Sequence, residues 1–302
     1  MKNNNQTVTA VLQPEVVVKH TCLLGEGPVW DAKRQTICWV DILKGEIHEF
    51  SPEQKTLRTI PVHQMIGAVA LCTNGNFVAA LQNGLGFVDR ESGEVSIVSD
   101  PEVHLPNNRF NEGKCDTEGR FWAGTMSLSE EESAGSLYIA GKDLSVTKKI
   151  AGVTISNGMA WSVKHGKFYF IDTPTFEVAT YDYDKTTASI KNRKTAIKVP
   201  EEDGHPDGMT IDNEGMLWIA HFNGWQVTRW NAETGQKLHT VKLPVSQVTS
   251  CTFGGANLDD LYITTASKEL SEEQLQEQPL AGSLFVVRNC GFTGLPAFMF
   301  KA

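Results

Sequence analysis

The sequence lacks the features of a secreted or membrane-spanning chain. Its first residues, MKNNNQTVTA, are mostly polar, and no apolar segment of a secretory signal follows them. No stretch approaches the roughly 18 apolar residues of a transmembrane helix. We therefore expect a cytoplasmic protein that does not enter a membrane.

Cysteine is scarce, and the cysteines are not paired in sequence. There are six, and none forms a CxxC pair. This spacing favours buried, small apolar side chains in a reducing compartment, and it leaves disulfides or a zinc site open as alternatives. The six are Cys22, Cys38, Cys72, Cys115, Cys251 and Cys290.

Common catalytic signatures are absent as well. The chain has no G-x-S-x-G elbow, no Walker or Rossmann glycine loop and no HExxH motif. Positive charge is in deficit, with 27 Lys and Arg against 36 Asp and Glu and a net charge of −9. An acidic surface repels phosphate backbones, so nucleic acid is not expected as a partner.

What the sequence does contain is a repeat. A polar turn followed by an aromatic and β-branched run recurs six times, at intervals of 40 to 49 residues. Strands repeating with a period in the forties are typical of β-propeller blades. The runs are Ile37 to Asp41, Phe77 to Leu81, Phe121 to Thr125, Phe168 to Asp172, Leu217 to His221 and Leu261 to Thr265.

The repeat predicts an all-β fold, a six-bladed β-propeller with four antiparallel strands in each blade. The 302 residues form one propeller domain in this interpretation, and residues 1–12 are expected to be a flexible tail. Glu15 to Lys19 reads as a strand that completes the last blade and closes the ring, which removes an exposed edge. Two segments interrupt the strands: an acidic loop at 127–134, and a short helix at 270–280 that Ser271 is expected to cap.

The first strand of each blade lies nearest the axis of a propeller, so its equivalent positions converge there. Ten or eleven residues before each aromatic run, four repeats carry a side-chain oxygen: Glu26, Asn111, Asn157 and Asp207. Any one of them reads as a turn residue, since N-G and D-G are common turn dipeptides. Four equivalent copies instead predict an oxygen-rich site for one divalent cation: Ca²⁺, Mg²⁺, Mn²⁺ or Zn²⁺.

Residues beside these positions suggest further roles. A glycine follows directly in three of the four repeats, and we expect it to allow close approach of backbone and ligand. Arg109 precedes Asn111 by two residues and is predicted to hold the substrate. His205 precedes Asp207 by two residues and is interpreted as a loop residue.

These motifs, taken together, resemble the family of senescence marker protein-30 (regucalcin), gluconolactonase and the luciferin-regenerating enzyme. The resemblance covers roughly residues 20 to 290. It is carried by Leu24-Gly-Glu-Gly-Pro-Val-Trp30, Asn108-Arg-Phe-Asn-Glu-Gly-Lys114, Gly119-Arg-Phe-Trp-Ala-Gly-Thr-Met126, Ser156-Asn-Gly-Met-Ala-Trp161, Pro206-Asp-Gly-Met209 and Gln278-Pro-Leu-Ala-Gly282.

The resemblance implies a role for each candidate residue. By it, Glu26, Asn157 and Asp207 bind the metal, and Asp207 is also the acid and base. Arg109 and Asn111 would contact substrate, which moves Asn111 out of the ligand set. Some members use a carboxylate after the Gly-Thr-Met phrase; the count lands on Ser129 here, so Glu130 would take the role or none would. Glu112 departs mildly from the family, whose members often carry Asp there.

The function expected from this resemblance is metal-dependent hydrolysis of a sugar lactone. The cation would activate water together with Asp207, and the product would be an open aldonic acid. Two alternatives stay open at this point: hydrolysis of another ester or a phosphotriester at the same site, and a calcium-binding protein without catalysis. Oligomeric state is not predicted.

Overall fold

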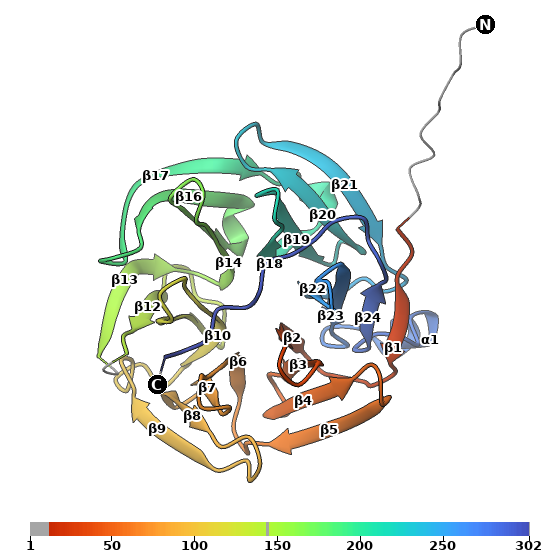
Figure 1. Cartoon of the computed structure of the whole chain (residues 1–302), viewed down its shortest axis with the longest axis horizontal. Coiled ribbons are helices and arrows are strands. Elements are labelled where there is room, and N and C mark those ends of the chain that lie inside the picture. The colour runs from red at the N-terminus through yellow and green to blue at the C-terminus, as the bar shows by residue number, and fades with distance from the viewer. Residues whose placement is uncertain (1–11, 143–144, 302) are drawn as a thin grey trace, which may run out of the picture.

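The aromatic and β-branched runs form strands because such side chains pack well on a pleated, buried surface. In the computed structural model, which describes residues 12–142 and 145–301, these strands belong to six four-stranded antiparallel sheets. The sheets stand around a central axis as the blades of a propeller (Figure 1). The predicted fold class is therefore confirmed.

Blades 1 to 3 run in sequence order from the axis outward. Blade 1 is β2 (Gly25–Asp31), β3 (Thr36–Asp41), β4 (Glu46–Ser51) and β5 (Thr56–Pro61). Blade 2 is β6 (Ile66–Leu71), β7 (Phe77–Leu81), β8 (Gly84–Val88) and β9 (Val95–Ser99). Blade 3 is β10 (Asn108–Cys115), β11 (Phe121–Ser127), β12 (Gly135–Ala140) and β13 (Val146–Val153).

Blades 4 to 6 continue the ring. Blade 4 is β14 (Ser156–Ser162), β15 (Lys167–Asp172), β16 (Glu177–Asp184) and β17 (Ser189–Lys198). Blade 5 is β18 (His205–Ile211), β19 (Leu217–Phe222), β20 (Gln226–Asn231) and β21 (Gln236–Lys242). Blade 6 is β22 (Val248–Gly254), β23 (Asp260–Thr265), β24 (Leu284–Val287) and β1 (Glu15–Val18).

The ring closes where the two ends of the chain share a blade. β1 pairs antiparallel with β24, with Glu15 opposite Val286 and Val16 opposite Phe285. The N-terminal strand therefore completes blade 6, as predicted. Residues 1–11 of the expected tail lie outside the described residues, and Leu12 packs against the apolar contact between blades 5 and 6.

The core consists of the contacts between neighbouring blades. The described residues form six apolar clusters, and each cluster joins two adjacent blades. Burial is complete in second strands such as β7 and is largely lost in outer strands such as β9. All six cysteines are buried and free.

Within the described part of the chain, helix occurs only in short connections. α1 (Glu272–Glu277) begins at Ser271, whose hydroxyl accepts a hydrogen bond from the backbone N–H of Gln274, so the predicted cap is confirmed. Two 3-10 turns lie between strands. η1 (Thr173–Thr175) connects β15 to β16, and η2 (Glu201–Asp203) lies between β17 and β18. The C-terminal segment crosses one end of the axis (Figure 1) and pairs Gly294 with Asp212 and Phe300 with Cys72.

Candidate active site

A β-bulge lies near the start of every innermost strand. In each of the six blades, the pairing of the first and second strands shifts register there. A bulge leaves residues unpaired and redirects their side chains. The shift contains or adjoins the repeat position occupied by Glu26, Gly67, Asn111, Asn157, Asp207 and Ser250.

The glycines that follow this position serve packing between blades. A Cβ on Gly158 of β14 would lie 2.5 Å from the Cβ of Met209 in β18, and one on Gly208 would overlap Ser250 of β22. The neighbouring innermost strands therefore approach too closely for a side chain. The expectation that these glycines make room for a ligand is wrong for Gly158 and Gly208, because the neighbouring strand fills that space.

One cavity at this end of the axis brings the predicted site residues together. Its volume is about 300 Å³, at the lower end of the roughly 300–1,000 Å³ of small-molecule sites. All six candidates line it: Glu26, Arg109, Asn111, Glu130, Asn157 and Asp207. The innermost strands of blades 1, 3, 4 and 5 supply five of them. The sixth, Glu130, comes from the loop after β11.

The amide of Asn157 has a defined orientation. The Thr173 hydroxyl donates its only proton to the carbonyl oxygen of Pro206, at 2.8 Å. It must therefore accept its second bond, so the Asn157 atom 2.7 Å away is the Nδ2 donor. This leaves the Oδ1 oxygen of Asn157 on the other side, where it accepts a bond of 3.2 Å from Asn111 Nδ2.

The amide of Asn111 is oriented in the same way. Its Nδ2 group donates to the carbonyl oxygen of Ser156 at 2.8 Å. Its Oδ1 oxygen accepts a hydrogen bond of 2.7 Å from the Nη1 group of Arg109. Because this oxygen is bound to a guanidinium, it is a poorer cation ligand than the oxygen of Asn157.

Three buried carboxyl groups gather on the axis. Burial raises the pKa of Glu26 well above its ordinary value, and the charges of Asp207 and Glu112 raise it further. Burial, followed by Glu112, likewise raises the pKa of Asp207. Glu26 and Asp207 are also hydrogen-bonded to each other. Without a cation, the pair therefore retains protons that exposed carboxyl groups would lose.

Backbone N–H groups hold these carboxylates in place. Gly27 donates to Glu26 Oε2 at 2.8 Å, and the N–H of Gly208 bonds to Asp207. Two carboxylates and one carboxamide oxygen, converging from three blades, are donors that suit a hard divalent cation. The unfavourable proximity of the carboxylates is what such a cation would offset. The residues present therefore fit a bound divalent cation.

Two cationic side chains, Arg109 and Lys114, interact with the charges of this centre. Burial lowers the pKa of Arg109 to about 10, so its guanidinium stays charged at neutral pH. Deeper on the axis, the Lys114 ammonium donates to the carbonyl oxygens of Met159 and Met209, at 3.2 and 2.7 Å. The charge of Lys114 favours ionised Glu112, although burial keeps the pKa of Glu112 raised.

The mouth of the cavity carries a second pair of charges. The Lys268 ammonium lies 3.8 Å from the carboxylate of Glu130, and both residues line the cavity. Ser129, on which the family count lands, instead accepts a bond of 3.0 Å from Asn107 Nδ2. His205 lines the wall, with its ring centroid 5.1 Å from that of Phe176.

Sequence reasoning missed Thr173, Lys268 and the axial position of Glu112. A usable signal existed for the first two. In an antiparallel pair the second strand ends beside the start of the first, so residues just after each aromatic run lie at the rim of the site. Thr173 directly follows one run, and Lys268 follows another by three residues.

None of the helices among residues 12–142 and 145–301 is long and apolar enough to cross a membrane.

The fold and the site together define a six-bladed β-propeller with an oxygen-donor site on its axis. The family model named SMP-30/Gluconolactonase/LRE-like region matches residues 24–267. The chain therefore belongs to this family, and the resemblance stated above is confirmed.

Individual relatives match nearly the whole chain. Regucalcin of Xenopus laevis is 40% identical over 286 residues, which is 93% of this chain and 96% of the relative. The "Putative sugar lactone lactonase YvrE" of Bacillus subtilis (strain 168) is 37% identical, covering 87% of this chain and 90% of the relative. The structure of regucalcin from Agrobacterium tumefaciens, called a calcium-binding protein, has a TM-score of 0.90 at 27% identity, covering 95% of this chain and 97% of that one.

Proposed function

We propose that the chain is a cation-dependent lactonase that opens the internal ester of a sugar lactone. One observation carries the proposal: two carboxylates and an oriented carboxamide face the same cavity as the buried Arg109–Asn111 pair. A site that only stored ions would have no use for a guanidinium beside its ligands. The name of the Bacillus subtilis relative supports the substrate class.

Glu26, Asn157 and Asp207 would hold the cation. A divalent cation in this position supplies polarisation of the lactone carbonyl and a lower pKa for water. It could be Ca²⁺, Zn²⁺, Mg²⁺ or Mn²⁺, since oxygen donors accept all four.

The protein's own groups would orient the substrate and move the proton. Arg109 and Asn111 hold the sugar hydroxyls, and Glu130 contacts substrate at the mouth of the cavity. Asp207 accepts a proton from the attacking water as the water oxygen bonds to the carbonyl carbon. The bond from that carbon to the ring oxygen then breaks, and Asp207 returns the proton to the ring oxygen. The product is an open aldonic acid.

A pH-stat assay with a panel of aldonolactones tests this function. The chain is stripped with EDTA and then supplied with each of the four cations in turn. We expect turnover only with a cation present. Asp207→Asn should reduce it by roughly 10²–10⁴-fold, the range of general acid–base catalysis. Asp184→Asn, which alters an exposed carboxylate on β16, is the matched control and should retain full activity.

The same assay separates the alternatives. Stoichiometric calcium binding with no turnover of any lactone would indicate a calcium-binding protein, the description of the Agrobacterium relative. Turnover of aryl esters or phosphotriesters in preference to lactones would indicate the other hydrolase. Wild-type turnover by Asp207→Asn would contradict the role of Asp207 itself.

A further inference from the structure

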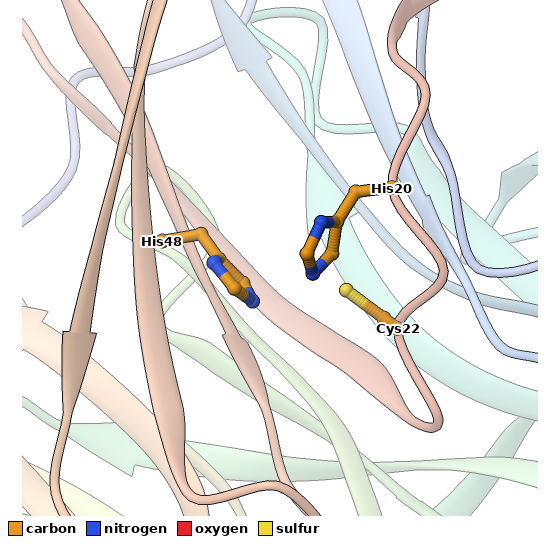
Figure 2. A group of neighbouring side chains, drawn as sticks. All are labelled: His20, Cys22 and His48. Atoms are coloured by element: carbon orange, nitrogen blue, oxygen red, sulfur yellow. The ribbon is translucent and has the colours of Figure 1, made fainter.

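A group of potential metal ligands lies outside the axial cavity, where the ring closes. His20 and Cys22 belong to the segment that connects β1 of blade 6 with β2 of blade 1, and His48 lies in β4 of blade 1. Figure 2 shows the three side chains directed toward one another. One ligand atom from each falls within 4.8 Å of the other two.

Backbone contacts hold Cys22 and His48 in a fixed position. The Cys22 N–H donates to the carbonyl oxygen of Gly282, at 3.1 Å. The Cys22 carbonyl oxygen accepts a bond of 2.9 Å from the Ser267 hydroxyl. His48 lies within β4, paired with Trp39 on one side and Thr59 on the other. Ligands on such rigid elements need little reorganisation to bind an ion.

Each of the two imidazoles has a buried nitrogen that forms no hydrogen bond within residues 12–142 and 145–301. His48 is fully buried, and its Nδ1 atom lies 3.0 Å from the Thr59 hydroxyl. Among the residues that the structure describes, its Nε2 atom has no hydrogen-bond partner, and neither does Nε2 of His20. Buried polar atoms are normally satisfied, so two such nitrogens beside a thiol need an explanation.

Their chemistry matches that of a metal ligand. Burial lowers the pKa of His48 to about 4, so its imidazole is neutral and offers a lone pair. The Thr59 contact on Nδ1 fixes the ring, as outer partners do for metal-binding histidines. Burial raises the pKa of Cys22 to about 12, so an ion would have to displace the thiol proton on binding.

We propose that His20, Cys22 and His48 form a second metal site, selective for Zn²⁺ and similar transition ions, at the closure of the propeller. One thiolate and two imidazoles suit these ions, whereas Ca²⁺ and Mg²⁺ prefer the oxygens on the axis. The carboxylate of Glu46 lies beside this group, with its Oε2 atom 3.6 Å from His48 Nε2.

The site would have a structural role. The segment carrying His20 and Cys22 connects the outermost strand of blade 6 to the innermost strand of blade 1. An ion bound also to His48 would link this segment to the third strand of blade 1. Because the ion binds the folded ring and not the unfolded chain, it would stabilise the closure.

Cobalt substitution tests the proposal directly. The full chain is stripped of metal under reducing conditions and titrated with Co²⁺. We expect thiolate-to-cobalt charge-transfer absorption that saturates at one ion per chain. Oxygen ligands do not produce this absorption, so the axial site does not contribute. The absorption should be lost in Cys22→Ala and His20→Asn, whereas lactone turnover should persist in both.

Two matched variants complete the experiment. Cys72→Ala removes another buried thiol whose pKa burial also raises to about 12, and it should keep the absorption. Asp207→Asn should keep it too while losing turnover, which separates this site from the proposed function. In the Asp207→Asn background, Zn²⁺ should raise the Tm, and adding Cys22→Ala should remove that increase.

Failure would be equally clear. No charge-transfer absorption in the wild type, or full absorption in a natively folded Cys22→Ala, would overturn the proposal. If circular dichroism shows that Cys22→Ala does not fold, the test rests on His20→Asn. His20 is only partly buried, so we expect this variant to fold, and its full absorption would overturn the proposal.

Discussion

At the scale of single residues, the site depends on which way Asn157 turns its amide. The Thr173 hydroxyl fixes that choice, since it accepts from Asn157 Nδ2 and donates to the carbonyl oxygen of Pro206. Thr173→Val keeps the shape of the side chain and removes the hydroxyl. Because metal affinity falls roughly 10–100-fold when such outer partners are lost, we expect Ca²⁺ binding to weaken by that factor in calorimetry.

A nearby threonine provides the control for this prediction. Thr175 lies in the same 3-10 turn but is exposed, and its hydroxyl donates to the Asp172 carbonyl oxygen, at 2.7 Å. Thr175→Val should leave Ca²⁺ affinity unchanged. If Thr173→Val bound Ca²⁺ as tightly as the wild type, the amide orientation would have another cause.

Only part of this site could be predicted from the sequence, and the reason is physical. The oxygens at Glu26, Asn157 and Asp207 are visible because their spacing repeats. The orientation of the Asn157 amide is not, because Thr173 and Pro206 meet it only after the blades assemble. The position of Glu112 near the other two carboxylates likewise depends on the bulge in β10, which no local pattern indicates.

At the scale of elements, the innermost strands must pack closely around the axis. Gly208 of β18 lies against Ser250 of β22, and an alanine Cβ there would overlap the Ser250 side chain and lie 2.8 Å from its Cα. Gly208→Ala should therefore push blades 5 and 6 apart and displace Asp207. Overpacking of this kind costs about 1–3 kcal/mol, which denaturant unfolding would measure.

The same contact offers a rescue. Ser250→Gly removes the Oγ and Cβ atoms that the new methyl group would overlap. The double variant should recover part of the lost stability, and its Ca²⁺ affinity should rise with it. Independent, additive effects of the two changes would argue against a direct conflict between these strands.

The strands themselves were largely predictable, and the reason is local. Phe77 to Leu81 coincides with β7, because aromatic and β-branched residues between turns favour buried strands wherever they occur. The Ser271 cap was also predictable, since a capping box is complete within four residues. Lys268 could have been found in the same way, because it follows the aromatic run Leu261 to Thr265 by three residues and so lies at the rim of the site.

At the scale of the whole molecule, the axial site couples blades that are distant in sequence. Glu26 belongs to blade 1, Asn157 to blade 4 and Asp207 to blade 5, so a cation held by all three would bind the ring together. The carboxylates of Glu26 and Asp207 oppose assembly when no cation is present, since burial and the nearby charge of Glu112 raise the pKa of both. Stability of the ring should therefore depend on pH and on cation together.

The sign of that dependence follows from the raised pKa values. The folded chain holds protons on Glu26 and Asp207 that the unfolded chain releases near the ordinary values of 4.5 and 3.8. This contribution to stability is complete below those values and is lost as pH rises through the raised pKa values. Between the ordinary pKa and the raised pKa of each group, the free energy of unfolding falls by about 1.4 kcal/mol per pH unit for each such proton. A saturating cation reverses the trend because it favours the ionised carboxylates.

The measurement is Tm against pH, with EDTA and with Ca²⁺, for the wild type and for Asp207→Asn. We expect the stabilisation by Ca²⁺ to grow as pH rises in the wild type. Asp207→Asn removes one of the opposed charges, so its EDTA curve should fall less steeply and its gain from Ca²⁺ should be small. Asp184→Asn should leave the difference between the two curves as in the wild type, because Asp184 is exposed and its pKa is lowered by backbone N–H groups. Identical EDTA curves for the wild type and Asp207→Asn would mean that the axial carboxylates do not oppose closure of the ring.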